Sequence, residues 1–190
     1  LPELLKDEFL RGTRNIVVTG THGKTTTASM VAHILKANGC DPSHMIGGIP
    51  LDLGKGGNFT DSEFFVLEGD EYDTAFFDKR SKFIHYLPEV VVINNIEFDH
   101  ADIFENLDAI KLSFRRMLNV VPRSGVVYLN GDDPDAVDVG TDCPAPVISV
   151  GFGEECVYRI EDVGYSPGSS VFTLNGERYK VPMDGEFNVR

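Results

Sequence analysis

The strongest constraint on the fold is a short β-branched run that enters a glycine-containing loop and then an amphipathic helix. The run covers residues 15–19 (NIVVT), the loop covers residues 20–26 (GTHGKTT), and a helical pattern follows until Gly39. Four apolar residues mark the buried face of that helix: Ala28, Val31, Ala32 and Leu35. A strand, loop and helix in this order let backbone N–H groups converge on an anion, so the segment predicts a phosphate-binding loop.

The residue types in the loop fit a nucleoside triphosphate with a divalent cation. Gly23 permits close approach of the backbone, Lys24 can reach the β- and γ-phosphates, and the hydroxyl of Thr25 can enter the Mg²⁺ shell. We expect the whole loop to contact ATP: Gly20, Thr21, His22, Gly23, Lys24, Thr25 and Thr26.

The loop departs from the general pattern G-x-x-x-x-G-K-[ST]. Val18 stands where the first glycine belongs, and Gly20 follows two residues later. A glycine-rich turn with a chance lysine is the plainer interpretation. The preceding strand, the following helix and the Lys24-Thr25 pair favour the phosphate site.

Further apolar runs place this loop in a larger fold. Residues 64–67 and 90–93 do not alternate with polar residues, which is typical of strands buried on both faces of a parallel sheet. An amphipathic helix is expected over 107–118, and strands over 126–129 and 147–150. Alternating strands and helices predict right-handed βαβ units, with ligands outside the carboxyl ends of the strands.

The pattern changes to short β segments from about Val157. Residues 171–174 and 178–181 flank Asn175-Gly176, which predicts a hairpin with a type I′ turn. The predicted fold class is therefore α/β, a doubly wound and mostly parallel sheet of P-loop type with a small appended antiparallel β-sheet.

Acidic residues follow the buried run 64–67 directly. Glu68 lies where the strand emerges, and a carboxylate there suits a hard cation that needs oxygen ligands. Asp70, Glu71 and Asp73 come next, and a solvated acidic loop is the plainer interpretation for some of them. Glu68 is the preferred candidate for a metal ligand.

A second polar segment follows the run 90–93. Its sequence, NNIEFDH, ends in His100 and places a carboxylate and an imidazole at the mouth of the same sheet. His100 is a candidate ligand of a second divalent cation. A lone loop histidine is as often a surface or capping residue, so both interpretations stay open.

The composition limits the partners and the compartment. The formal net charge of −13 and the pI near 4.7 argue against nucleic acid and anionic membranes as partners. The three cysteines lack metal-ligand spacing, which is typical of a reduced, cytoplasmic protein. No apolar run approaches the roughly 20 residues of a membrane-spanning helix, so we expect a soluble chain.

Three polar segments of the chain resemble motifs of the Mur ligases of peptidoglycan precursor assembly in their order and spacing. The segments are residues 20–26, 68–73 and 94–100. Residues 72–83 with His85-Tyr86 resemble the branch that recycles peptides rather than the L-alanine-adding branch. The resemblance implies an ATP-dependent, amide-bond-forming ligase with ATP and Mg²⁺ as cofactors. UDP-N-acetylmuramate and a murein tripeptide are its implied substrates.

The resemblance also implies roles for single residues. Lys24 contacts the phosphates, Thr25 and Glu68 bind one Mg²⁺, and His100 helps to bind the second. Lys111 occupies a place similar to a carbamylated lysine of some relatives, which makes the expected catalytic set Lys24, Glu68, His100 and Lys111. Four residues are candidates for substrate contacts: Asp70, Glu71, Arg80 and Lys82.

The adenine side is implied more weakly. Asn130 lies in an Asn-Gly-Asp-Asp segment similar to one that follows a strand of the family. Asn188 lies in a segment similar to a Gly-x-His-Asn motif, in which Phe187 here replaces the histidine. Asn188 is therefore the expected adenine contact, and Asn130 is a further expected contact of ATP.

The implied reaction begins with attack of the lactoyl carboxylate of UDP-N-acetylmuramate on the γ-phosphate of ATP. The tripeptide amine then attacks the acyl phosphate. We expect residues 1–190 to be the central domain alone, without the N-terminal UDP-binding domain and the C-terminal lid of Mur ligases. Such a fragment would bind Mg·ATP weakly without ligation.

Three other functions compete with this interpretation. A nucleotide-dependent switch of the GTPase type would need an Asn-Lys-x-Asp guanine motif, and the sequence has none. A folylpolyglutamate-type ligase and the L-alanine-adding Mur ligase share the loop and the fold. The segment 76–83 argues against both.

Overall fold

The β-branched and apolar runs form the centre of a mixed sheet in the computed structural model, which describes residues 2–75, 78–99 and 104–189. The helical elements are α1 (Pro2–Leu5), η1 (Lys6–Leu10), α2 (Lys24–Ala37), η2 (Lys82–Tyr86), α3 (Leu107–Leu118), α4 (Pro134–Gly140) and η3 (Glu186–Asn188). The first strands are β1 (Arg14–Thr19), β2 (Ser43–Met45), β3 (Gly57–Asn58), β4 (Phe64–Glu68), β5 (Asp73–Ala75) and β6 (Asp78–Ser81). The others are β7 (Val90–Ile93), β8 (Val126–Asn130), β9 (Val147–Gly151), β10 (Tyr158–Ser166), β11 (Ser169–Leu174) and β12 (Glu177–Val181).

The main sheet has the order β12-β11-β10-β9-β8-β7-β1-β4-β2-β3. Strand β1 lies between β4 and β7 and pairs parallel with both, so that Val18 is level with Glu68 and with Val92. Strands β2, β8 and β9 extend the parallel pairing, and β3 closes one edge antiparallel. The predicted α/β class with a mostly parallel sheet is confirmed.

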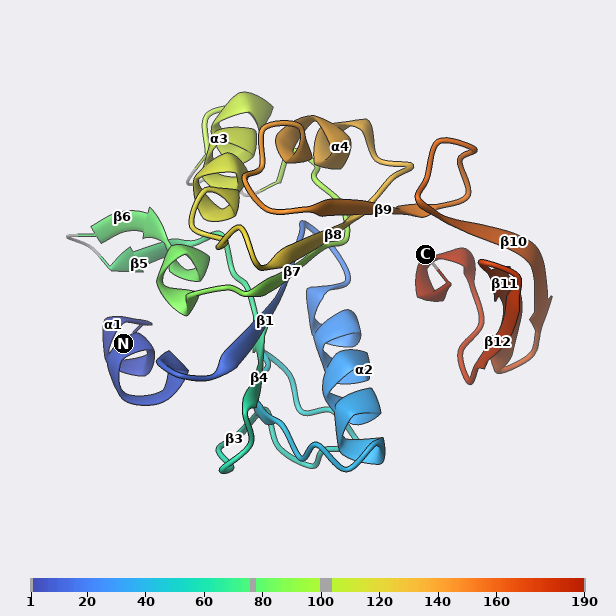
Figure 1. Ribbon diagram of the computed structural model, residues 1–190, viewed down its shortest axis with the longest axis horizontal. Helices are drawn as coiled ribbons and strands as arrows, with labels where there is room; N and C mark the ends of the chain where they lie inside the picture. The colour runs from blue at the N-terminus through green and yellow to red at the C-terminus, as the bar shows by residue number, and fades with distance from the viewer. Residues whose placement is uncertain (1, 76–77, 100–103, 190) are drawn as a thin grey trace.

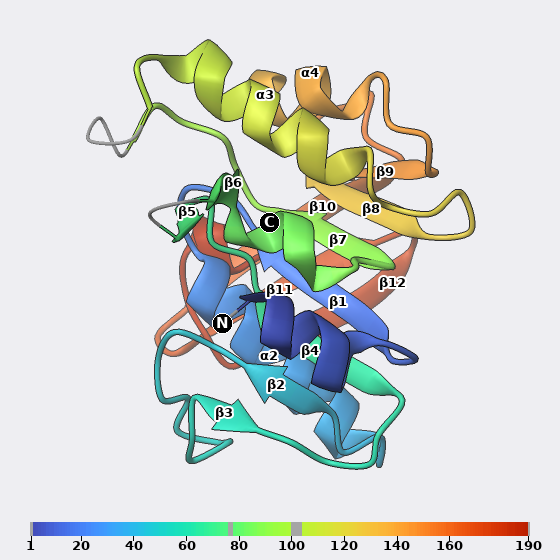
Figure 2. The ribbon, with the colours of Figure 1, turned by 90° about the vertical axis from the view of Figure 1, so that its left-hand side faces the viewer.

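Helices cover both faces of the sheet (Figure 1). Val17 of β1 packs into one core with α3, α4 and η2, whereas Val18 packs into a second core with Ala28 and Ala32 of α2. The same alternation runs through β4 and β7, because successive side chains of a strand point to opposite faces. Figure 2 shows α3 and α4 above β7, β8 and β9, whereas α2 is drawn lower, near β1 and β4.

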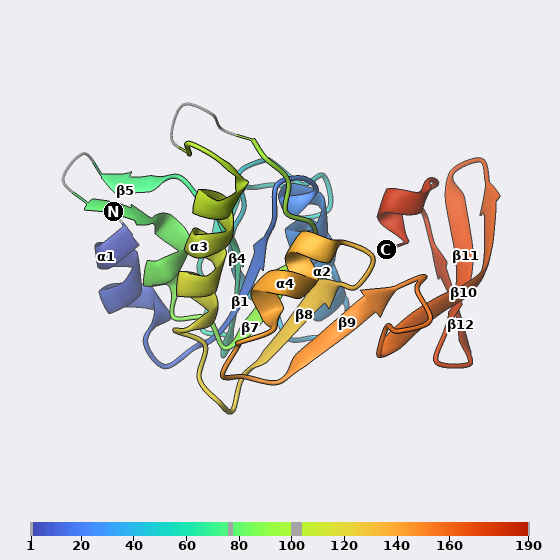
Figure 3. The ribbon, with the colours of Figure 1, turned by 90° about the horizontal axis from the view of Figure 1, so that it is seen from above.

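The three C-terminal strands extend away from the centre of the molecule (Figure 3). Strand β10 is parallel to β9 over two residue pairs only, and β10, β11 and β12 then pair antiparallel. Asn175 and Gly176 connect β11 to β12 with φ values of 51° and 81°, the positive pair that a type I′ turn requires. The expected hairpin is present, and β10 joins it to the main sheet.

Several short elements were not predicted from the sequence. The strand pairs β2–β3 and β5–β6 are too short to show a hydrophobic period. Helix α4 has seven residues, although it carries a recognisable start: Asp133 caps it and Pro134 is its first residue. No helix of the described residues is long and apolar enough to span a membrane.

Candidate functional site

The N-terminus of α2 is an open anion site at the carboxyl end of β1. Gly23 precedes the helix with φ +79° and provides no side-chain cap. The N–H groups of Lys24, Thr25 and Thr26 have no acceptor within the helix, because the first turn of any α-helix lacks one. These groups and the positive end of the helix dipole are directed at the space where a phosphate would bind.

The loop before α2 is held by the segment that follows β7. The backbone N–H of Thr21 donates to the carbonyl of Asn95 at 3.0 Å, and the N–H of His22 donates to Asn95 Oδ1 at 2.7 Å. Asn94 Nδ2 donates to the carbonyl of His22 at 3.1 Å and to Thr27 Oγ1 at 3.1 Å. Thr21 and His22 therefore use their amides within the protein, and the predicted phosphate contacts of the backbone are left to the amides from Gly23 onward.

Gly20 is required by this close approach. Its φ is +130°, and a Cβ built there would lie 3.0 Å from both the backbone nitrogen and the backbone oxygen of Asn95. Val18, which stands in the place of the usual first glycine, is instead a fully buried residue of β1 that packs toward α2. Gly20 thus lies where the loop meets the segment that follows β7.

Replacing Gly20 with alanine is expected to lower the free energy of unfolding by about 1–3 kcal/mol, through backbone strain and contact with Asn95. Urea unfolding of both proteins measures the loss. Gly12→Ala is the matched control, because Gly12 also has a positive φ, +85°, but has nothing within 4 Å of its added Cβ. Equal losses in the two variants would contradict the role given to Asn95.

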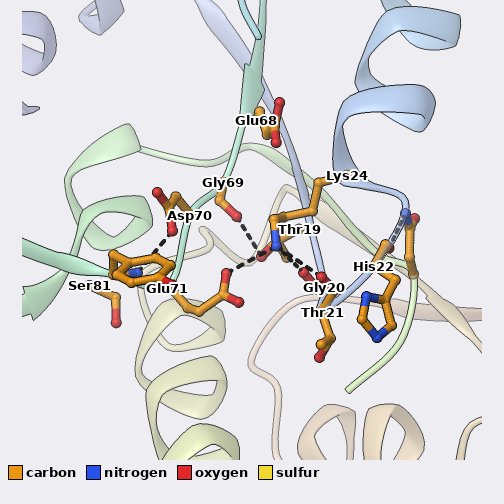
Figure 4. Close-up of polar contacts among 12 residues, drawn as sticks. Thr19, Gly20, Thr21, His22, Lys24, Glu68, Gly69, Asp70, Glu71 and Ser81 are labelled. Carbon is orange, nitrogen blue, oxygen red and sulfur yellow. Dashed lines mark hydrogen bonds and ion pairs between the residues drawn. The ribbon is translucent and has the colours of Figure 1, made fainter. Parts of the chain in front are cut away.

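Lys24 is folded back onto its own loop (Figure 4). Its ammonium donates to the carbonyl of Gly20 at 2.7 Å and to that of Thr21 at 3.2 Å. The same Nζ lies 3.3 Å from Oε2 of Glu71, whose side chain is 3% exposed. The predicted phosphate-binding lysine is thus at the mouth of the site, with a buried carboxylate beside it.

Thr25 and Glu68 meet at the end of β4. The hydroxyl of Thr25 donates to Glu68 Oε1 at 2.9 Å, and Glu68 Oε2 accepts the backbone N–H of Gly47 at 2.7 Å. A hydroxyl and a carboxylate in contact are the hard oxygen donors that Mg²⁺ prefers. Gly47 was not identified from the sequence, because its amide is 21 residues from Glu68 along the chain.

Of the three remaining candidates for substrate contacts, Asp70 and Lys82 form an ion pair. Asp70 accepts a hydrogen bond from Lys82 Nζ at 2.9 Å, and the ammonium of Lys82 lies 5.7 Å from the ring centre of Tyr72. Arg80 lies in β6, and its side chain is outside the described residues. The structure therefore brings Asp70, which follows β4, into contact with Lys82, the first residue of η2.

A cavity of about 390 Å³ adjoins this pair and the end of β4. Its lining is Pro2, Leu5, Met45, Ile46, Gly47, Glu68, Asp70, Thr74, Lys82 and Tyr86. Burial raises the pKa of Tyr86 to about 12, and the negative charges of Asp70 and Glu68 add to the shift. Tyr86 thus keeps its proton at neutral pH and adds a neutral hydroxyl to a wall that carries both charge signs.

His100 lies outside the described residues, so its predicted role as a ligand of a second cation stays a prediction. Within the described part of the chain, no group of three or more His, Cys, Asp or Glu residues could hold a metal ion. The contact between Thr25 and Glu68 is the geometry that supports a metal here.

Lys111 faces α4 rather than open solvent. Its Nζ donates to Asp135 Oδ1 at 3.0 Å and also contacts Asp138, and its side chain is 14% exposed. Hydrogen bonds to Asp138 and Asp135 raise the pKa of Lys111, which holds it as an ammonium. Carbamylation needs the neutral amine. The ion pairs account for Lys111 as a link between α3 and α4, and its catalytic role stays a prediction.

Asn130 ends β8, and the residues after it tie the neighbouring elements together. Asn130 Oδ1 accepts the N–H of Asp132 at 3.0 Å. Asp132 accepts the N–H groups of Phe152 and Gly153, each at 2.8 Å. Asp133 caps α4 and also accepts the N–H of Ile96 at 2.7 Å. Thus the Asn-Gly-Asp-Asp segment has a structural role, and the ATP contact of Asn130 stays a prediction.

The adenine candidate, Asn188, lies in η3, the last helical turn. Asn188 Nδ2 donates to the carbonyl of Asp184 at 2.8 Å, which stabilises η3. Phe187, which stands in place of the family's histidine, is 81% exposed. The contact of Asn188 with adenine also stays a prediction.

Comparison with known proteins agrees with this geometry. The family model described as the Mur ligase middle domain matches residues 18–190. A UDP-N-acetylmuramate–L-alanyl-γ-D-glutamyl-meso-2,6-diaminoheptandioate ligase of Haemophilus influenzae is 47% identical over 135 residues, which are 71% of this chain and 30% of that protein. A UDP-N-acetylmuramate–L-alanine ligase of Variovorax paradoxus is 35% identical over 196 residues, covering 98% of this chain and 39% of that protein.

A solved structure gives the same picture. The UDP-N-acetylmuramate:L-alanyl-γ-D-glutamyl-meso-diaminopimelate ligase from Neisseria meningitides superimposes with a TM-score of 0.89 at 40% identity. The match covers 98% of this chain and 61% of that one. The chain therefore spans roughly a third of its sequence relatives, 30% and 39% of the two named above.

Proposed function

Because this chain belongs to the Mur ligase family as its middle domain, we propose that it is the ATP- and Mg²⁺-binding part of a murein peptide ligase. The full protein would join L-alanyl-γ-D-glutamyl-meso-diaminopimelate to UDP-N-acetylmuramate in peptidoglycan recycling in the cytoplasm. Support for the peptide comes from the Haemophilus influenzae and Neisseria meningitides relatives, at 47% and 40% identity, against 35% for the L-alanine ligase.

The observation that carries the proposal is the contact between Thr25 and Glu68 beside Lys24. The threonine hydroxyl and the carboxylate lie 2.9 Å apart at the carboxyl edge of the sheet, next to the open N-terminus of α2. A Mg²⁺ held by these oxygens would lie beside phosphates bound to the amides of the first helical turn. The metal would supply positive charge for the transferring phosphoryl group.

Lys24 would contribute the second positive charge. Its ammonium would exchange the ion pair with Glu71 for one with a phosphate oxygen. It would retain its hydrogen bonds to the carbonyls of Gly20 and Thr21. Charge neutralisation is needed, because the attacking lactoyl carboxylate and the γ-phosphate repel one another. The carboxylate would take the γ-phosphoryl group to form the acyl phosphate, and ADP would leave. The tripeptide amine would then displace phosphate and lose a proton to give the amide.

The cavity of about 390 Å³ is the proposed entry for the carboxylate substrate. It lies beside Glu68, and Lys82 is its cationic lining residue. Lys82 would leave Asp70 to pair with the incoming carboxylate, and Arg80 from β6 would assist. Among the other candidates, Asn188 would hold adenine, Asn130 would contact ATP, and His100 would hold a second Mg²⁺.

Ligation itself would need more than this chain. The relatives are roughly three times as long, since the chain spans 30% of the Haemophilus influenzae protein. We propose that a UDP-binding domain and a closing lid lie in that additional length. The central domain would then bind Mg·ATP weakly, because part of the nucleotide's contacts would come from the lid.

Calorimetry with Mg·ATP and Mg·GTP tests the nucleotide assignment. We expect binding of ATP in preference to GTP, and preferential GTP binding would favour a switch module instead. The full-length protein should then form the amide from UDP-N-acetylmuramate with the tripeptide as acceptor. Faster ligation with L-alanine would transfer the assignment to the L-alanine-adding branch, and ligation by the 190-residue chain alone would contradict the need for further domains.

A further inference from the structure

A buried carboxylate lies against Lys24, the proposed phosphate-binding lysine. Glu71 is 3% exposed, and its Oε2 is 3.3 Å from Lys24 Nζ. Two loop carbonyls take two of the three protons of that ammonium, at 2.7 Å from Gly20 and 3.2 Å from Thr21. The carboxylate of Glu71 is thus the third partner of the Lys24 ammonium, beside the two carbonyls.

Glu71 is poorly suited to stay there once a triphosphate is bound. Its negative charge would lie within reach of the same ammonium as the γ-phosphate, in a site partly closed to water, where like charges repel strongly. Lys24 is itself only 14% exposed, so solvent screens this repulsion weakly. One of the two anions has to leave Lys24.

We propose that Glu71 is a positioning residue that occupies the γ-phosphate's place at Lys24 until a nucleoside triphosphate displaces it. Glu71 holds the ammonium at the loop carbonyls, so that the lysine is already aimed at the site. In return it lowers the affinity for any nucleotide that brings a γ-phosphate. The inference rests on the proposed ATP site.

The place of Glu71 in the chain connects this exchange to the rest of the site. Glu71 is three residues after Glu68, the proposed metal ligand, and one residue after Asp70, which holds Lys82. Glu71 thus lies on the same short segment as the proposed metal ligand and the carboxylate that pairs with Lys82 at the cavity.

The experiment compares Glu71→Gln with the parent protein in binding Mg·ADP and the Mg complex of a non-hydrolysable ATP analogue. Glutamine keeps the shape and removes the charge. The expected result is an increase of roughly tenfold or more in affinity for the analogue, with little change for ADP, which lacks the γ-phosphate. The ratio of the affinity for the analogue to the affinity for ADP would not change if Glu71 had a purely structural role.

Glu63→Gln is the matched control, because Glu63 is an exposed acid that precedes β4, at the opposite end from Glu68. It removes the same charge and should leave both affinities unchanged. Glu71→Ala is the second variant if Glu71→Gln does not fold. An unchanged or weakened affinity for the analogue in a folded Glu71 variant would overturn the inference. Absence of nucleotide binding by the parent protein would instead overturn the proposed function, and the inference with it.

Discussion

Replacing Lys24 with methionine is expected to weaken Mg·ATP binding by about ten- to a hundredfold, because a charge-assisted hydrogen bond to phosphate contributes about 1.5–3 kcal/mol. Methionine keeps the length of the side chain and loses the ammonium. Calorimetry at fixed salt measures the change. Lys36→Met is the control, since Lys36 is an exposed lysine in the last turn of the same helix.

The stability of this variant needs its own measurement. Lys24 donates hydrogen bonds to two loop carbonyls and forms an ion pair with the buried Glu71, so it also contributes to the stability of the loop. Loss of the ammonium leaves a buried carboxylate without this ion pair, so we expect a lower Tm. Adding Glu71→Gln should recover Tm without restoring ATP binding. Unchanged ATP affinity in Lys24→Met would contradict the loop assignment.

Replacing Glu68 with glutamine is expected to remove the Mg²⁺ dependence of nucleotide binding. The variant keeps one oxygen for Thr25 and loses the charge that a divalent cation needs. ATP affinity measured with Mg²⁺ and with a chelator should differ by roughly tenfold or more in the parent protein, since such couplings are worth 1–3 kcal/mol. The two values should converge in Glu68→Gln.

Glu63→Gln is again the control, because it removes a charge just before the strand that ends in Glu68. It should retain the full difference between the two conditions. If Glu68→Gln also retained that difference, the metal would have to be held without Glu68. The contact between Thr25 and Glu68 would then be structural only.

Local patterns in the sequence were sufficient for the central elements. Unalternating apolar runs predict β4 and β7 because strands covered on both faces need apolar residues at every position, and both cores confirm this. The phosphate-binding loop could be predicted because Gly23, Lys24 and Thr25 are consecutive in the sequence and therefore close in space. A site formed by consecutive residues can be predicted from the sequence alone.

Contacts between distant segments were not predictable in this way. Asn95 reaches His22 across 73 residues, and Gly47 reaches Glu68 across 21. Lys111 shows the same limit: its helix was predicted, but its partners lie in α4, which is too short to recognise by periodicity. Glu71 was a candidate for substrate contact, and only the folded chain shows it beside Lys24.

The hold of Asn94 and Asn95 on the loop has a consequence for the thermodynamics of binding. Residues Thr21 and His22 are ordered by the segment after β7 before any ligand arrives. The loop has therefore already lost the conformational entropy that a disordered phosphate loop would lose on binding. Association should thus need little rearrangement of this loop, and the heat evolved should come mainly from new polar contacts.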